Sequence, residues 1–134
     1  MIRVRVTAKG MTARRLAPVM RESLARAVQA GAEDLRETAR DLISEPRGEG
    51  PSAPGTPPRR DTGRLRDSLF VRPSADGLSA EVGTELDYGA HLEFGTQTMP
   101  ARPWLHPAFE ATKGRIRRRL RAAVGRALRN GRLP

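Results

Sequence analysis

Residues 16–43 have the sequence LAPVMRESLARAVQAGAEDLRETARDLI, in which apolar side chains recur every three or four positions. This spacing places them on one stripe of a helix and leaves most charged residues on the other faces. A helix over residues 17–43 would be roughly 40 Å long, because an α-helix rises about 1.5 Å per residue. The sequence therefore predicts one long amphipathic helix, whose apolar stripe the rest of the chain or a neighbouring molecule must cover.

The segments around this helix have the patterns of strands and shorter helices. Residues 2–7 alternate β-branched with charged or polar side chains, which is typical of a half-buried strand. Residues 70–82 predict a hairpin, with a turn at Ser74–Gly77. We expect an α+β fold in which a small, mainly antiparallel sheet packs on the long N-terminal helix, with a basic helix at the C-terminus.

The chain length indicates one domain over residues 1–134. Residues 44–63 hold five prolines and four glycines. Such a segment cannot continue a helix and has few apolar side chains, so we expect a flexible arm at about residues 44–63.

The composition predicts a thin hydrophobic core. Leu, Ile, Val and Phe together number 26 of 134 residues, and the formal net charge is +10. A chain with this balance has difficulty burying enough apolar surface alone, so we expect both partial disorder and an assembly in which neighbouring subunits complete the core. There is no cysteine and therefore no disulfide framework. The absence of a long apolar run and of a signal-peptide pattern indicates a protein made in a cytoplasm, with no membrane partner.

The positive charge is concentrated at the C-terminal end. Residues 113–134 contain nine basic residues and no acidic one, which leaves 16 basic against 15 acidic residues in the rest of the chain. The candidates for contact with DNA or an acidic partner are Lys113, Arg115, Arg117, Arg118, Arg119, Arg121, Arg126 and Arg129. Because this stretch lacks aromatic side chains and a groove-reading motif, any nucleic-acid contact should be non-specific. A solvated charged face is the alternative.

Residues 88–109 hold both histidines, the only Trp, the only Tyr and two of the three Phe. The spacings of His91, Glu93 and His106 match no metal-ligand or catalytic motif, so we expect no enzyme activity, no metal and no cofactor. The segment instead predicts a rigid aromatic cluster that seats a loop or wedges against a neighbouring subunit. The candidate interface or loop-anchor residues are Tyr88, Glu93, Phe94, Arg102, Trp104 and Phe109. Glu93 either pairs with Arg102 or is exposed.

Three segments resemble the gene-ten-like (HK97-type) tail-component family of tailed bacteriophages. They are TGRLRDSL at 62–69, VGTELDYGAHLEFGT at 82–96 and ARPWLHPAFE at 101–110, with Gly89 beside Ala90 and Trp104 in the place where the family usually has Phe. The order and spacing of these segments, rather than any one of them, carry the resemblance.

The resemblance implies a non-enzymatic virion protein of the head–tail junction, assembled in the bacterial host cytoplasm. It would form a homo-oligomeric ring, expected to be a hexamer, that joins the capsid connector to the tail and surrounds the DNA channel. Its partners would be other neck and tail proteins, such as the head-completion (stopper) protein and the tail tube or terminator. Neck, tail-completion and tail-terminator positions stay open, as does a domesticated, gene-transfer-agent-like particle. The alternative function is a non-specific nucleic-acid-binding accessory protein that acts through the basic C-terminal helix.

Overall fold

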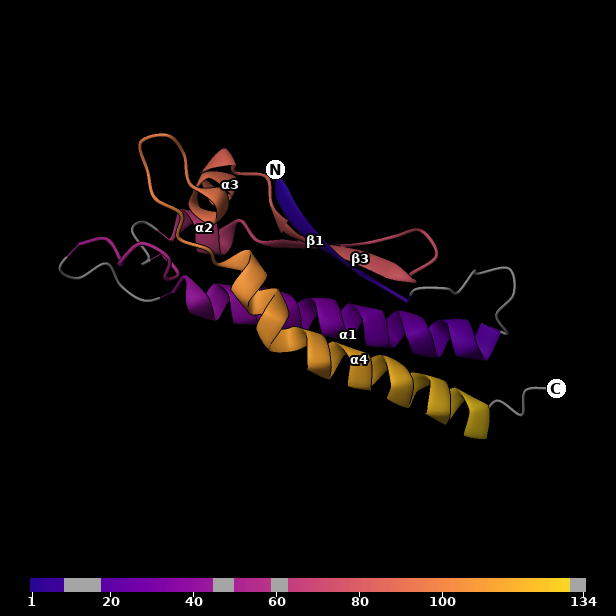
Figure 1. Cartoon of the computed structure of the whole chain (residues 1–134). Helices are drawn as coiled ribbons and strands as arrows, with labels where there is room; N and C mark the ends of the chain where they lie inside the picture. The colour runs from indigo at the N-terminus through magenta and orange to yellow at the C-terminus, as the bar shows by residue number, and fades with distance from the viewer. Residues whose placement is uncertain (9–17, 45–49, 59–62, 131–134) are drawn as a thin grey trace.

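A computed structural model describes residues 1–8, 18–44, 50–58 and 63–130. The order of elements is a strand, a long helix, a short helix, a hairpin, a second short helix and a long C-terminal helix (Figure 1). Their bounds are β1 Ile2–Thr7, α1 Pro18–Leu42, α2 Arg64–Asp67, β2 Phe70–Pro73, β3 Ser79–Thr84, α3 Asp87–Phe94 and α4 Leu105–Asn130. The predicted α+β class is confirmed, with a long N-terminal helix and a helical C-terminal segment.

The three strands form one antiparallel sheet in the order β1-β3-β2. Val82 at the centre of β3 is opposite Val4 of β1 on one side and Val71 of β2 on the other. The N-terminal strand therefore joins the hairpin from the outside, and β3, whose Ala80 and Val82 are buried, is the central strand. Consequently β1 is an edge strand of the sheet.

The long helix α1 is covered on two sides. The sheet lies over one side, and α4 runs antiparallel along another (Figure 1). A Cβ atom built on Gly31 of α1 would lie 3.2 Å from Ile116 Cγ1, so the small residue permits the close approach of the two helices. The Ser23 hydroxyl donates to the carbonyl of Ala123 at 3.0 Å. Small side chains thus set the distance between α1 and α4.

Despite the composition, the described residues form an apolar interior that consists of two clusters. Its largest fully buried apolar side chains are Trp104, Leu24, Leu35, Leu105, Val28 and Val82. Alanines such as Ala32, Ala39 and Ala108 fill the spaces between these side chains. A second, smaller cluster forms around Met20, Leu24 and Leu78. Alanine therefore contributes to the core by close packing rather than by large buried area. Completion of the core by neighbours stays a prediction.

The Pro/Gly-rich segment is described over residues 50–58, and the rest of the predicted arm apart from Ser44 and Gly63 lies outside the described residues. Within the described part, the Gly55 N–H donates to the Ala101 carbonyl at 2.8 Å. Arg102 Nε donates to the Ser52 carbonyl at 2.9 Å. These two hydrogen bonds attach the middle of the segment to the loop that precedes α4.

Candidate functional site

The start of α4 is capped by a glutamate from another helix. Glu93, at the end of α3, is buried, and its carboxylate accepts hydrogen bonds from three consecutive backbone N–H groups. Oε2 accepts from Trp104 at 2.7 Å and from Leu105 at 2.9 Å, and Oε1 accepts from His106 at 2.9 Å. A helix leaves its first N–H groups without intrahelical partners and carries a partial positive charge there. The Glu93 carboxylate therefore supplies hydrogen-bond acceptors for these N–H groups and a negative charge that compensates the partial positive charge.

Trp104 is held by its ring as well as by its backbone. The side chain is fully buried, and its indole Nε1 donates to the Gly89 carbonyl at 2.9 Å. A Cβ atom on Gly89 would lie 2.5 Å from Thr84 Cγ2 and 3.3 Å from Trp104 Cζ2. A residue with a side chain at position 89 would therefore displace the indole or the strand end. Glycine is needed here because of this close approach.

A buried threonine connects the end of β3 to the turn after α2. Thr84 Oγ1 lies 2.7 Å from the Ser68 hydroxyl, and the backbone N–H of Leu86 donates to the same oxygen at 3.1 Å. Ser68 also donates to the Leu65 carbonyl at 2.7 Å. These bonds fix the position of α3 relative to the sheet, because α3 begins three residues after Thr84.

These contacts join the three segments that carry the family resemblance. Ser68 lies in residues 62–69 and Thr84 in residues 82–96, where Gly89 and Glu93 contact Trp104 of the third segment. We call Ser68, Thr84, Gly89, Glu93 and Trp104 the capping unit. Their side chains or backbone groups make contacts within a single chain. The segments therefore have an intramolecular role that composition alone did not indicate.

Both alternatives predicted for Glu93 are wrong, because it is buried rather than exposed and its carboxylate binds backbone N–H groups rather than Arg102. Both Glu93 oxygens are used by the N-terminal N–H groups of α4, whose partial positive charge compensates the carboxylate. Arg102 instead donates to the Ser52 carbonyl, and its own backbone N–H donates to the Leu92 carbonyl at 2.6 Å. The Arg102 side chain thus contacts the Pro/Gly-rich segment rather than Glu93.

The predicted aromatic cluster does not form within the chain. Trp104 is fully buried and Phe109 is partly buried against the main core, whereas Tyr88 is 54% exposed and Phe94 is 75% exposed. Trp104 therefore anchors the loop. Tyr88 and Phe94 lie on the surface of α3, where they are accessible to another molecule.

An apolar groove lies beside Phe94. It has a volume of about 400 Å³ and is formed between the edge strand β1 and the start of α4. Its apolar lining comes from Ile2, Val4, Phe94, Pro103 and Leu105. A large exposed aromatic side chain in the lining of an apolar groove is typical of a protein–protein contact.

The basic residues of α4 do not act as one uniform face. Lys113 Nζ pairs with Glu110 at 2.6 Å. Arg115 makes a two-pronged contact with Asp34 of α1, from Nε to Oδ2 at 2.9 Å and from Nη2 to Oδ1 at 3.0 Å. The hydrogen bond from Arg115 is the main reason that the pKa of Asp34 lies below its ordinary value of 3.8, and burial opposes this shift.

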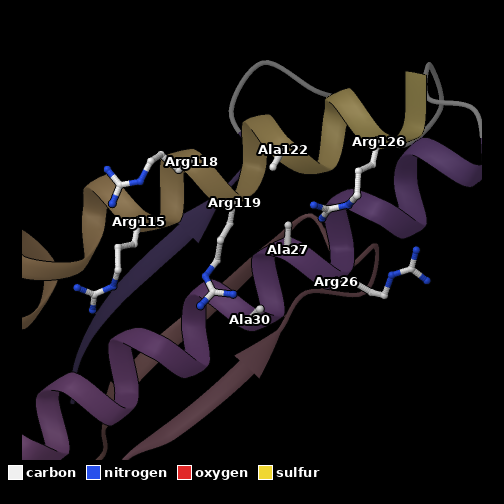
Figure 2. Close-up of a pocket in the computed structure, with 8 residues that line it drawn as sticks. All are labelled: Arg26, Ala27, Ala30, Arg115, Arg118, Arg119, Ala122 and Arg126. Carbon is white, nitrogen blue, oxygen red and sulfur yellow. The ribbon is translucent and has the colours of Figure 1, made fainter. Parts of the chain in front are cut away.

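A second groove, of about 650 Å³, lies between α1 and α4 and is lined by arginines (Figure 2). Arg115, Arg118, Arg119 and Arg126 come from α4, and Ala27, Ala30 and Ala122 are also part of its lining. Arg26 of α1 completes the set. Of the predicted contact residues, Lys113, Arg117, Arg121 and Arg129 do not line this groove. We call Arg26, Arg115, Arg118, Arg119 and Arg126 the arginine groove.

Arg26 was not among the sequence-predicted contact residues. Its spacing from Glu22 favours an ion pair along α1, but no such pair occurs among the described residues, and Arg26 lines the groove instead. Only the antiparallel pairing of the two helices brings it close to the arginines of α4.

Within residues 1–8, 18–44, 50–58 and 63–130, no group of three or more His, Asp or Glu side chains could hold a metal ion. None of the described helices is both long enough and apolar enough to cross a membrane.

Comparison with protein families gives a match over the N-terminal and central parts of the chain. The model of the family described as "Bacteriophage HK97-gp10, putative tail-component" matches residues 12–95, which is 84 of the 134 residues. The match ends before the loop and α4, so it includes Ser68, Thr84, Gly89 and Glu93 but neither Trp104 nor the arginines of α4. No curated protein and no solved structure matches the chain.

Proposed function

The chain belongs to the HK97-gp10-like family of phage tail components, and on this premise we propose that it is a structural protein of the head–tail junction. In this proposal copies of the chain form a closed ring, expected to be a hexamer, in the neck or at the tail-completion or terminator position. The ring joins the capsid connector to the tail and binds other neck and tail proteins above and below it. It surrounds the channel through which DNA passes.

The observation that carries this proposal is the exposure of Phe94 beside the apolar groove. A Phe side chain left in water forgoes about 1.5–3 kcal/mol that burial would provide. On one copy Phe94 is 75% exposed, and the adjoining groove between β1 and α4 is open. We propose an adjacent copy of the chain as the occupant of this surface, because a head-to-tail contact between different surfaces generates a ring when the rotation closes.

The composition supports the same conclusion. A near-neutral body with few large aliphatic residues gains stability when neighbours cover its apolar surface. The capping unit holds Phe94 and the start of α4 in a fixed relation, so the proposed contact surface is formed before assembly. Preorganisation of this kind lowers the entropic cost of association.

The test is the oligomeric state of purified protein, by mass photometry and negative-stain microscopy. We expect rings of the wild-type chain, alone or with purified neck partners, and monomers of Phe94→Gln. His91→Gln is the matched control, because His91 is exposed on the same helix but does not line the groove. Phe94→Gln should unfold at the wild-type temperature when both are measured as monomers, since the Phe94 side chain is mostly in solvent. Wild-type monomers that never join a ring would overturn the proposal.

A second candidate function has one observation in its favour. Arg118, Arg119 and Arg126 on α4 form no ion pair with a carboxylate in the part of the chain that the structure describes. A free, non-specific nucleic-acid-binding accessory protein would use such residues. Deleting α4 would not test it, because Ile116 and Ala123 of that helix are in the core. Salt-dependent DNA binding by a protein that stays monomeric with all neck partners would favour this candidate over the ring.

A further inference from the structure

We propose that the arginine groove is a binding site for the phosphodiester backbone of duplex DNA. The site is built by two helices that lie far apart in the sequence, since Arg26 comes from α1 and its other arginines come from α4. This inference rests on the proposed function in one respect, namely that DNA passes beside the assembled protein. It adds which face of the protein contacts the DNA and which chemical group is bound.

Asp34 offsets part of the positive charge of the groove, through its contact with Arg115 and a weaker electrostatic interaction with Arg119, and the rest has no ion-pair partner among the described residues. Arg115 is committed to Asp34, but Arg26, Arg118, Arg119 and Arg126 form no ion pair with a described carboxylate. All four are exposed residues. Figure 2 shows Arg119 and Arg126 reaching from α4 toward α1, whereas Arg118 and Arg26 lie at opposite rims. The site therefore gathers several exposed guanidinium groups that are available to an anionic partner.

The lining selects the kind of anion. Between the arginines the groove has only alanine side chains, from Ala27, Ala30 and Ala122, so it lacks the aromatic or large aliphatic anchor that an acidic protein segment would need. It also lacks an aromatic surface on which bases could stack. What remains is guanidinium, whose forked donors match the geometry of phosphate oxygens. These features favour a ligand that is recognised by its phosphates alone.

The arrangement along the helix suits a polymer better than a single phosphate. Arg115, Arg119 and Arg126 are four and then seven residues apart, which keeps them on one face of α4. They span 11 residues, or roughly 16 Å at about 1.5 Å per residue. One DNA strand carries a charge about every 3.4 Å of helix axis, so this length faces several successive phosphates.

The opposite face of α4 provides a matched control. Arg117 and Arg121 each lie two residues from Arg119, which places them about 160° away around the helix. Both are exposed, and neither lines the groove. The variants R119A/R126A and R117A/R121A therefore remove the same charge from the same helix and differ in the face that loses it.

The experiment measures binding of a fluorescent 25-base-pair duplex by anisotropy over a series of salt concentrations. Each phosphate contact contributes about 0.9 to the slope of log K against log salt. We expect R119A/R126A to weaken binding and to lower the slope by about 1.8, and we expect R117A/R121A to change the slope by less than half as much. Unchanged thermal unfolding of both variants would show that the difference comes from binding.

Three outcomes would overturn the inference. They are an equal loss of affinity and slope in the two variants, no duplex binding by the wild type at 50 mM salt, and binding of polyglutamate but not of DNA. Failure of the ring proposal is a separate result, because it is read from oligomeric state. A ring-forming protein without groove-dependent DNA binding overturns this inference and leaves the proposed function. A protein that is always monomeric but binds DNA through the groove overturns the proposed function and leaves this inference.

Discussion

Replacing Glu93 with Gln should destabilise the protein by removing one acceptor from the start of α4. The amide oxygen of Gln can take the place of Oε2 and keep the bonds from Trp104 and Leu105. The amide NH2 then faces the backbone N–H of His106 and cannot accept from it. The substitution also removes the negative charge that complements the helix N-terminus.

The expected cost is about 2 kcal/mol. A hydrogen bond to a charged group contributes about 1.5–3 kcal/mol, and a charge at a helix terminus adds about 0.3–1 kcal/mol. The His106 N–H is only partly buried, so water can replace part of the lost bond and the lower end applies. For a chain of this size the midpoint of thermal unfolding should fall by roughly 6–8 °C. Glu93→Ala leaves all three N–H groups without an acceptor and should cost about 4 kcal/mol or more.

Thermal and urea unfolding at one fixed protein concentration measure these differences, because association would otherwise add stability. Glu85→Gln is the control, since Glu85 is 65% exposed and makes an ion pair with Arg72 at the surface. Exposed pairs contribute about 0–1 kcal/mol. If Glu93→Gln and Glu85→Gln unfold at the same temperature, the capping role assigned to Glu93 is wrong.

Two further predictions concern the core and the link between the helices. Trp104→Ala should cost about 3–5 kcal/mol in urea unfolding, because the side chain is fully buried. His91→Ala and His106→Ala, at exposed positions, should each cost less than about 0.5 kcal/mol, and equal losses in all three would contradict this order. Asp34→Asn should destabilise the protein by at most about 1 kcal/mol at pH 7. Because Arg115 holds the pKa of Asp34 below 3.8, this contribution is present above that pH and lost as the pH falls through the folded-state pKa. The difference between variant and wild type should therefore shrink at pH 2, and a difference that is the same at both pH values would refute the assignment.

The elements of the fold could be predicted because each has a local signal. The alternation at residues 2–7 and the three- to four-residue spacing at 17–43 come from side chains that are neighbours in sequence and share a face. The structure places these elements at Ile2–Thr7 and Pro18–Leu42. The hairpin turn at Ser74–Gly77 has an equally local cause, with a Ser74 carbonyl that accepts from the Gly77 N–H at 3.1 Å.

The contacts of the candidate site were not predictable in the same way. Glu93 accepts hydrogen bonds from backbone N–H groups that lie 11 to 13 residues further along the chain. The periodicity of apolar residues in a helix or strand does not predict a contact over such a separation. One signal was available. The start of α4, at Trp104 and Leu105, has no Ser, Thr, Asp or Asn at the cap position, so its N–H groups need an acceptor from elsewhere. Glu93 is the only acidic residue between Tyr88 and Phe109.

The arginine groove depends on how the two long helices are aligned. Arg26 meets the arginines of α4 because Gly31 allows Ile116 to pack closely, which sets the register between the helices. A sequence shows the charge of each helix but not this register. The sequence names the basic residues of α4 as contact candidates, but it does not separate those that line the groove from Arg117 and Arg121, which do not.

The two candidate surfaces share helix α4, and this connects assembly with DNA contact. Leu105 at the start of α4 lines the apolar groove, and Arg126 lines the arginine groove 21 residues later, roughly 30 Å along the helix. Glu93 fixes the start of α4, and the contact between Gly31 and Ile116 fixes its middle. The arginines therefore cannot turn independently of the Phe94 surface. If neighbouring copies bind through that surface, the symmetry of the ring orients every arginine groove in the same way relative to the ring axis.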